Sequence, residues 1–381
     1  MNIASQNSRS TPGLSASIDA GLDSDMPVAY SFDSVPKIGV PTEVADGIWL
    51  IRLPISLAMD HVNVYLLADG DGWTLVDTGC NVDNCREVFL NSLEQFPINQ
   101  LPIQRVIVTH FHPDHVGMAG YFTGGDTSPH SATLLTSRTT WHSTRLLLAD
   151  SPAVPHDEHI AFMQLSGMKG IELESFKRRS PSTYAEKVSP LPASYQRLRE
   201  LDELTIGNRQ WKVRLGNGHA DEHITLWSDD NIAIVGDQIL PAISPNLSVH
   251  FSEPAADCVA DWMTSCSAFA KIAKGSTLCL PGHNRPFTGA PTRCKQLIDN
   301  CQQVLDRIVE SLSKPKTAME VMPDIYRRKL SAYEKHLLLG ETIGYLNHLM
   351  FAGRVKRKTS SQGCHLWRRP PTLSSQAKET Q

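Results

Sequence analysis

The segment His110-Phe111-His112-Pro113-Asp114-His115 places four potential metal ligands within six residues, directly after the run Ile103–Val108. This run predicts a buried strand, and the first two histidines then leave its carboxyl end on the same side, because alternate side chains of a strand share a face. The proline suits the first position of a helix, where its missing N–H is not needed. The last Asp and His would lie on that first turn. The spacing favours a metal site over a solvated His-rich loop.

Other predicted strands also end in an Asp or a His. A single Gly-His or Gly-Asp pair is a weak signal, since it is more often a turn than a ligand. Here such residues follow four further strand patterns, each beside a flexible Gly or a helix start, and together with the six-residue segment they predict one shared site. These residues are Asp77, His219, Asp237 and His283.

The order of these motifs resembles that of the metallo-β-lactamase-fold hydrolase superfamily over about residues 40–300. The matching segments are Asp77-Thr78-Gly79, His110–His115, Gly218-His219, Gly236-Asp237 and Gly282-His283. The resemblance implies an α/β fold, an αββα sandwich with a dinuclear metal site at one edge. It also implies the ligands: His110, His112 and His219 for one ion, Asp114, His115 and His283 for the other, and Asp237 as a bridge.

The same resemblance implies supporting roles for two residues. Asp77 would orient the ligands through hydrogen bonds, which metal sites generally need, and His223 would support the site rather than bind metal. True β-lactamases of this fold have Cys where this chain has Asp237. A carboxylate instead resembles the hydroxyacylglutathione hydrolase, lactonase and ribonuclease branches, so antibiotic hydrolysis is not the expected activity.

Imidazole and carboxylate ligands without a thiolate suit zinc, iron or manganese. We expect two divalent ions per chain, with zinc as the first choice. Two close ions lower the pKa of a bridging water and polarise a carbonyl or phosphoryl oxygen. Asp114 lies beside the bridging position and can pass on a proton, so Asp114 and Asp237 are the candidate catalytic residues. The expected reaction is hydrolysis of an ester, thioester, lactone or phosphodiester.

The composition is that of an ordinary globular chain, with 381 residues of which 41% are hydrophobic and 20% charged. No apolar run approaches the roughly 20 residues that span a membrane, so no membrane partner is expected. Residues 1–36 are rich in Ser, Asp and Gly without the apolar core of a signal peptide, which predicts a disordered leader. Eight cysteines without a Cys-x-x-Cys pair indicate reduced thiols and a cytoplasmic protein.

We expect the catalytic domain to span residues 37–313, with an insert at about 120–203 that would cover the active site. The loop Gln238–Ser252 would form a pocket wall, where His250 could approach a substrate, although a surface position is favoured for it. Residues 314–370 predict two helices and a basic hairpin, which resemble the winged-helix module that closes some members of the superfamily, an endoribonuclease-like group among them. Residues 371–381 read as a disordered tail.

The distribution of net charge along the chain helps to choose between a hydrolase of small molecules and a nuclease. From Lys314 onward the chain has 13 Lys and Arg against 5 Asp and Glu, a net of +8, which leaves −12 for residues 1–313 out of a total of −4. An acidic catalytic part repels a nucleic-acid backbone, and the hairpin offers only Trp367 for base stacking. The sequence therefore favours a hydrolase of a small thioester, ester or lactone, with the module as a pocket wall or homodimer contact. The alternative is a metal-dependent endoribonuclease whose basic module holds nucleic acid.

Overall fold

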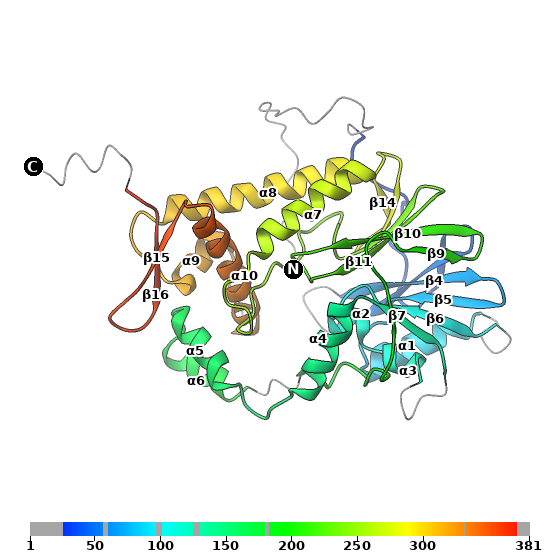
Figure 1. The fold of residues 1–381 in the computed structure, drawn as a ribbon, viewed down its shortest axis with the longest axis horizontal. Coiled ribbons are helices and arrows are strands. Elements are labelled where there is room, and N and C mark those ends of the chain that lie inside the picture. Colours follow the sequence, from blue (N-terminus) through cyan, green and yellow to red (C-terminus); the bar gives the residue numbers. More distant parts are fainter. Residues whose placement is uncertain are drawn as a thin grey trace, which may run out of the picture.

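The computed structural model describes residues 26–55, 60–96, 101–124, 130–179, 183–330 and 332–371. Two seven-stranded sheets pack face to face and carry helices on their outer faces (Figure 1). The predicted αββα sandwich is therefore confirmed. None of the helices in these ranges combines the length and apolar character that a bilayer-spanning helix needs.

The first sheet has the strand order β2-β3-β4-β5-β6-β7-β8. Strands β2 to β5 pair in antiparallel fashion, whereas β5, β6, β7 and β8 run parallel. Because parallel strands end at the same edge, β5 and β6 deliver Asp77 and His110 to one place. The bounds are β2 Thr42–Ala45, β3 Ile48–Pro54, β4 His61–Asp69, β5 Gly72–Val76, β6 Ile103–Ile107, β7 Thr133–Thr136 and β8 Gln196–Arg197.

The second sheet has the order β1-β14-β13-β12-β11-β10-β9. Its one parallel pair is β12 with β13, and these two strands are followed by Asp237 and His283. The bounds are β1 Ala29–Tyr30, β9 Glu203–Ile206, β10 Arg209–Gly216, β11 His223–Ser228, β12 Ile232–Gly236, β13 Leu278–Pro281 and β14 Phe287–Thr288.

The prediction of a disordered leader over residues 1–36 is wrong at β1, which pairs with the edge of the second sheet. Ala29 pairs with Thr288 of β14, and the guanidinium carbon of Arg285 lies 3.8 Å from the centroid of the Tyr30 ring. The sheet edge and a cation–π contact thus hold residues that a polar composition marked as disordered. Residues 1–25 of that leader, and residues 372–381 of the expected tail, lie outside the described residues.

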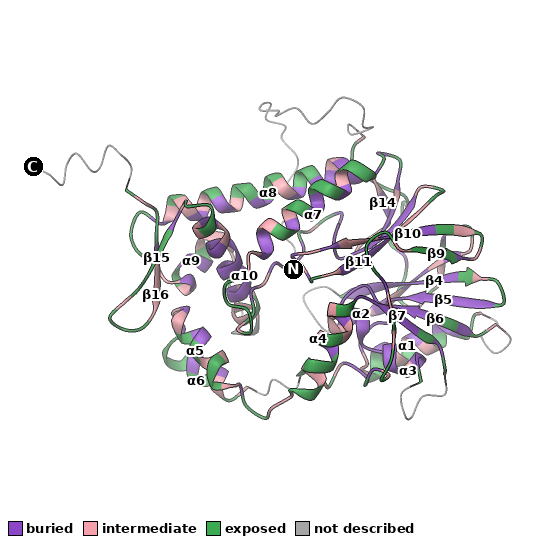
Figure 2. Ribbon diagram, viewed as in Figure 1, coloured by how far each residue is buried: buried purple, intermediate pink, exposed green. Residues whose placement is uncertain are grey.

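Three hydrophobic cores hold the layers together. One lies between the sheets, one lies between the first sheet and α1–α3, and the third lies between the second sheet and α7–α8. Figure 2 shows β5 buried throughout, whereas α8 exposes part of its outer surface. The helix bounds are α1 Asp83–Leu93, α2 Pro113–Val116, α3 Ala119–Phe122, α7 Cys258–Ile272 and α8 Ala290–Ser311.

The insert and the C-terminal elements pack against each other (Figure 1). The insert contains α4 Arg138–Ala149, α5 Asp157–Leu165 and α6 Gly170–Lys177, and the C-terminal part contains α9 Ala318–Ile325, α10 Ala332–Phe351, β15 Lys356–Thr359 and β16 His365–Arg368. Met319 N–H donates to the Ser166 carbonyl at 3.1 Å. Side chains of α5, α8 and α10 share the third core, so the C-terminal part is built into the catalytic domain's own packing.

Candidate metal centre

The seven candidate ligands come from both sheets and meet at one edge of the sandwich. They lie on the β6–α2 connection, in the loop between β10 and β11, and just after β12 and β13. Their nitrogen and oxygen atoms fall into three groups, each within 4.8 Å. These are His110, His112 and His219; His110, His115 and Asp237; and Asp114, His115 and His283.

The first group consists of three imidazole nitrogens. His110 Nε2 lies 2.9 Å from His112 Nδ1, which lies 3.0 Å from His219 Nε2, and the third side, from His219 Nε2 to His110 Nε2, is 3.3 Å. Tetrahedral coordination with zinc–nitrogen bonds of about 2.0–2.1 Å spaces its nitrogens by about 3.3 Å. The triangle therefore has nearly the dimensions of one face of a zinc site.

The other two groups share His115 and together contain both carboxylates, Asp237 and Asp114. Asp237 Oδ2 lies 3.2 Å from His283 Nε2 and 3.4 Å from His115 Nε2, and it is also 3.5 Å from His219 Nε2 of the first group. Asp114 Oδ2 lies 3.5 Å from His283 Nε2 and 3.8 Å from His115 Nε2. One oxygen of Asp237 thus lies within 3.5 Å of His219 in the first group and of His115 and His283 outside it.

Hydrogen bonds behind the ligands fix their tautomers. Three Nδ1 atoms face oxygens that only accept, so each Nδ1 carries the proton and each Nε2 turns a lone pair toward the site. The contacts are His115 Nδ1 to Asp77 Oδ2 at 2.7 Å, His283 Nδ1 to the His61 carbonyl at 2.7 Å and His219 Nδ1 to the Asn246 carbonyl at 2.9 Å.

Thr109 fixes the tautomer of His110 in the same way. The Thr109 hydroxyl donates to Asp77 Oδ2 at 2.8 Å and so accepts from His110 Nδ1 at 3.0 Å. In the described part of the chain, the buried Nε2 atoms of His115 and His283 have no hydrogen-bond partner. Buried lone pairs that converge without a donor fit a metal cation, and the donor set fits the ions expected from the sequence.

The pKa values of the candidate ligands shift in two directions. Burial, together with the neighbouring histidines, holds the pKa of His110 and of His112 well below the usual value. Burial also lowers the pKa of His219. Burial raises the pKa of Asp237, but His283 and His115 lower it by more, so the net value lies well below the usual range. Burial lowers the pKa of His115 and of His283, but Asp237 and the other nearby carboxylates raise it by more, well above the usual value for His115 and above it for His283. Imidazoles bind metal in the neutral form, so an ion bound here would displace a proton from these two histidines.

His223 lies behind the ligands. Its ring stacks on His110 with centroids 4.6 Å apart, and its Nε2 accepts the Asp237 backbone N–H at 3.2 Å. Burial lowers its pKa to about 3. Gly236 permits this packing, because its φ is +49° and a Cβ there would lie 2.6 Å from His223 Cε1. His223 therefore supports the site instead of joining the ligand groups.

The sequence did not reveal every residue that holds the site. Thr109 precedes the six-residue motif, but a Thr at a strand end is too common to be a signal. The carbonyls of His61 and Asn246 act through the backbone, so their residue types carry no information. His250, expected on the pocket wall, is exposed. From the insert, Tyr184 donates to the Phe111 carbonyl at 2.6 Å and so contacts the ligand motif.

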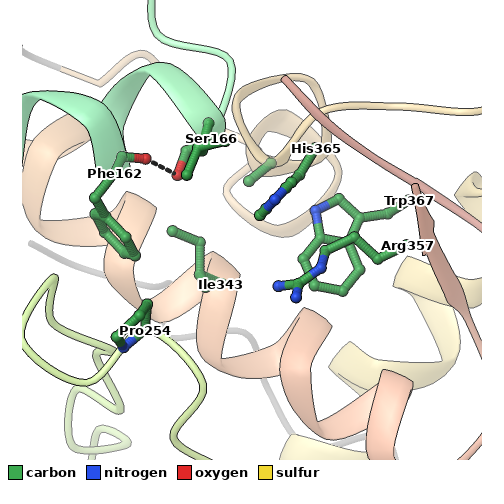
Figure 3. A pocket seen from close by; sticks show the side chains of 9 residues that line it. Phe162, Ser166, Pro254, Ile343, Arg357, His365 and Trp367 are labelled. Atoms are coloured by element: carbon green, nitrogen blue, oxygen red, sulfur yellow. Dashed lines mark hydrogen bonds between the residues drawn. The ribbon is translucent and has the colours of Figure 1, made fainter. Parts of the chain in front are cut away.

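A cavity of about 40 Å³ lies apart from this site, among α5, α10 and the β15–β16 hairpin (Figure 3). Its wall is mainly apolar, and the guanidinium carbon of Arg357 lies 5.3 Å from the centroid of the Trp367 ring. None of the seven candidate ligands lines it. A substrate in this cavity would therefore not meet the ligand groups.

Comparisons with known proteins agree with the geometry. The family model of the Metallo-beta-lactamase superfamily matches residues 58–130, and that of the Metallo-beta-lactamase-like, C-terminal domain matches residues 305–370. A beta-lactamase domain protein from Burkholderia ambifaria has a crystal structure that superposes with a TM-score of 0.82. It is 32% identical, and the match covers 90% of this chain and 98% of that chain. The chain belongs to the metallo-beta-lactamase superfamily.

Two further proteins extend the likeness. YqjP of Bacillus subtilis (strain 168), described as a probable metallo-hydrolase, is 25% identical over 306 residues, which cover 78% of this chain and 91% of that protein. The crystal structure of a metallo-beta-lactamase family protein from Thermus thermophilus is 22% identical with a TM-score of 0.72, covers 86% of this chain and 100% of that chain, and shares the fold. The family expected from the sequence is confirmed.

Proposed function

We propose that the chain is a hydrolase that uses two divalent ions, with zinc as the first choice, to cleave a small thioester, ester or lactone. The observation that carries this proposal is the position of Asp237 Oδ2, which is within 3.5 Å of nitrogens from both ligand groups. His110, His112 and His219 would hold one ion, Asp114, His115 and His283 the other, and Asp237 would bridge them. The eight free thiols agree with the reducing cytoplasm that we propose for the protein.

When bound, such ions supply hydroxide at neutral pH and stabilise negative charge on the substrate oxygen. Asp114 is the residue placed to move the proton, because its carboxylate borders the second ligand group at 3.5 Å from His283 Nε2. Its side chain is 11% exposed, whereas those of His115 and His283 are fully buried. Its carboxylate would accept a proton from the attacking water and return it to the leaving group.

The charge of the catalytic part supports a small substrate over a polyanion. Residues 1–313 carry a net −12, and an acidic surface weakens binding of a phosphate backbone. The test is a panel of thioesters, esters, lactones and an RNA, assayed on one metal-loaded preparation beside the Asp114→Asn variant. We expect turnover of at least one small substrate and a loss of about 100-fold in Asp114→Asn, as for removal of a general base. RNA cleavage without turnover of any small substrate would reverse the assignment.

A nuclease is the second candidate because of the β15–β16 hairpin, which we interpret as the wing of a winged-helix module. Lys356 lies directly opposite Arg368 in the antiparallel register, and Lys358 shares that face. All three are exposed, and among the residues described none of them has an acidic partner. Like charges placed opposite each other destabilise a hairpin, so a bound polyanion would account for them.

The triple change of Lys356, Lys358 and Arg368 to Gln separates the two candidates. Arg357 is left intact because it lies against Trp367, and Arg354 because it pairs with Asp306 at 2.8 Å. For a small substrate, turnover stays within a few-fold of the parent and depends little on salt. For a nuclease, each lost phosphate contact weakens RNA binding and flattens the salt slope by about one unit.

A further inference from the structure

Three buried residues of strand β4 form hydrogen bonds to the turn that carries His283, which spans Pro281–Asn284. These residues are His61, Asn63 and Tyr65, which are 5%, 1% and 2% exposed. Because alternate residues of a strand share a face, their side chains lie on one side of β4, the side that meets the second sheet. Strand β4 belongs to the first sheet and the turn to the second, so these contacts join the two sheets beside the metal centre.

Asn63 makes three of the hydrogen bonds. Its backbone N–H donates to the Gly282 carbonyl at 2.7 Å. Its side-chain Nδ2 donates to carbonyls on both sides of His283, that of Pro281 at 2.9 Å and that of Asn284 at 2.8 Å. Both side-chain partners only accept, so the amide must turn its nitrogen toward the turn. One buried side chain thus connects the two ends of the turn.

Tyr65 and His61 add to these contacts. The Tyr65 hydroxyl donates to the Pro281 carbonyl at 2.7 Å, so this carbonyl has donors from two residues of β4. The His61 carbonyl accepts from His283 Nδ1 at 2.7 Å, and His61 Nε2 accepts the Asn284 N–H at 2.8 Å. The backbone of the turn and the candidate ligand itself are therefore held by the same strand.

The other side of the turn packs against candidate ligands. A Cβ on Gly282 would collide with Asp237 Oδ1 and lie 2.8 Å from His115 Cε1. The Gly282 N–H also donates to the Gly236 carbonyl at 2.8 Å. The turn thus lies between the ligands on one side and β4 on the other. Metal sites keep ligand distances to within about 0.2 Å, so a small shift of the turn would matter.

We propose that Asn63 and Tyr65 are positioning residues for His283, which they hold through the carbonyls of its turn. The first sheet, which contains β4, also supplies Asp114 and His115 from the end of β6. The contacts therefore fix His283 relative to the two residues with which it would share an ion. This inference rests on the proposed function, in which these three ligands hold one of the two ions.

The test is Asn63→Ala, which removes the side-chain donors, beside Tyr65→Phe, which removes one hydroxyl and keeps the ring. The matched control is Asn347→Ala. Asn347 is also buried, and its Nδ2 likewise donates to two carbonyls, those of Pro254 at 3.1 Å and Ala256 at 3.0 Å. Neither carbonyl belongs to a candidate ligand. Both Ala variants leave two buried carbonyls without a donor, so they should lose similar stability in urea unfolding.

Metal binding is measured by titrating metal-free protein with Zn²⁺ against a chromophoric chelator, and by the visible spectrum after loading with Co²⁺. His283→Ala identifies the ion concerned, because it removes one of that ion's ligands. We expect Asn63→Ala to weaken this ion about tenfold, the lower end for loss of a supporting contact, and to change its Co²⁺ spectrum. Tyr65→Phe has a smaller effect on the same ion, and Asn347→Ala matches the parent.

Amide hydrogen exchange of the metal-free protein tests the contacts without any ion. The N–H groups of Gly282 and Asn284 should exchange faster in Asn63→Ala than in the parent, and at the parental rate in Asn347→Ala. Faster exchange with parental affinity for both ions would assign Asn63 a structural role alone and refute the inference. Unchanged exchange in the turn would refute it as well.

Equal weakening of both ions, or the same loss in Asn347→Ala, would also overturn the inference. If Asn63→Ala does not fold, Tyr65→Phe decides, and parental affinity for both ions in that variant counts against the proposal. A parent that binds no second ion would instead refute the dinuclear function itself, whereas the exchange measurement would still report whether β4 holds the turn.

Discussion

Replacing Asp77 by Asn tests whether hydrogen bonds behind the ligands control metal binding. Asp77 Oδ2 accepts from His115 Nδ1 at 2.7 Å and from the Thr109 hydroxyl at 2.8 Å, while its Oδ1 accepts the Thr109 N–H. If the amide oxygen of Asn keeps the backbone contact, the amide nitrogen meets His115 Nδ1–H, donor against donor. His115 then exchanges tautomers and turns an N–H toward the metal. The Thr109 hydroxyl, now an acceptor from the amide, donates to His110 Nδ1 with the same consequence.

The magnitude follows from the two ligands affected. Loss of a ligand's supporting partner weakens metal binding about 10–100-fold, equivalent to about 1.4–2.7 kcal/mol. In the proposed assignment His110 holds one ion and His115 the other, so both ions should weaken by this factor. The backbone tolerates the change, because Asp77 has a φ of +59° and Asn adopts such a conformation readily.

The assay is competition for Zn²⁺ between metal-free protein and a chromophoric chelator. Asp71→Asn in the exposed turn between β4 and β5 serves as the matched control. Circular dichroism verifies that both variants fold. Parental affinity for both ions in Asp77→Asn would refute the tautomer argument, and weakening of one ion alone would exclude the route through Thr109.

Two further predictions concern the bridging carboxylate and acid stability. Asp237→Ala removes the carboxylate that lies within 3.5 Å of His115, His219 and His283, and it should lower turnover by at least about 100-fold. His142→Ala, at an exposed position of the insert, should stay within a few-fold of the parent, and equal losses would contradict the bridging role. Burial lowers the pKa of His223 to about 3 and of His61 to about 4. Since unfolded histidines take up protons near pH 6.5, metal-free protein keeps this stability above pH 6.5 and loses about 2 kcal/mol per residue on acidification to pH 5. Urea unfolding at both pH values measures the change, and equal midpoints would count against it.

The ligand set was predictable because the strands that bear it have clear patterns. The run Ile103–Val108 predicted the strand observed as β6, Ile103–Ile107, and the following histidines could only leave its carboxyl end. The parallel pairs β5–β6 and β12–β13 then bring residues from distant parts of the sequence to the same edge. Strand ends are local features, so the sequence indicates them without knowledge of the fold.

The partners of those ligands were not predictable in the same way. Asn246 contributes a carbonyl, which every residue has, and its loop was expected only to form a pocket wall. The packing of the C-terminal part was also hidden. Leu339, Ile343 and Leu346 recur at the spacing of one helix face, but this spacing does not indicate that the face shares a core with Leu305 of α8. A period in the sequence indicates which side of a helix is buried, whereas its partner depends on long-range packing.

The two features that the sequence did not indicate, the role of the Asn246 carbonyl and the packing of α10, meet at one place in the structure. Helix α10 packs its apolar face into the third core, and its residues Gly340 and Gly344 then meet the segment that follows Asp237. The segment can pass this close to the helix because neither residue has a side chain. Its far side presents the Asn246 carbonyl to His219. The first sheet orients its ligand His115 with a carboxylate of its own, Asp77. For His219 the second sheet relies on a helix about 120 residues later in the sequence, so the C-terminal part would contribute to metal binding whether or not it also contacts a substrate.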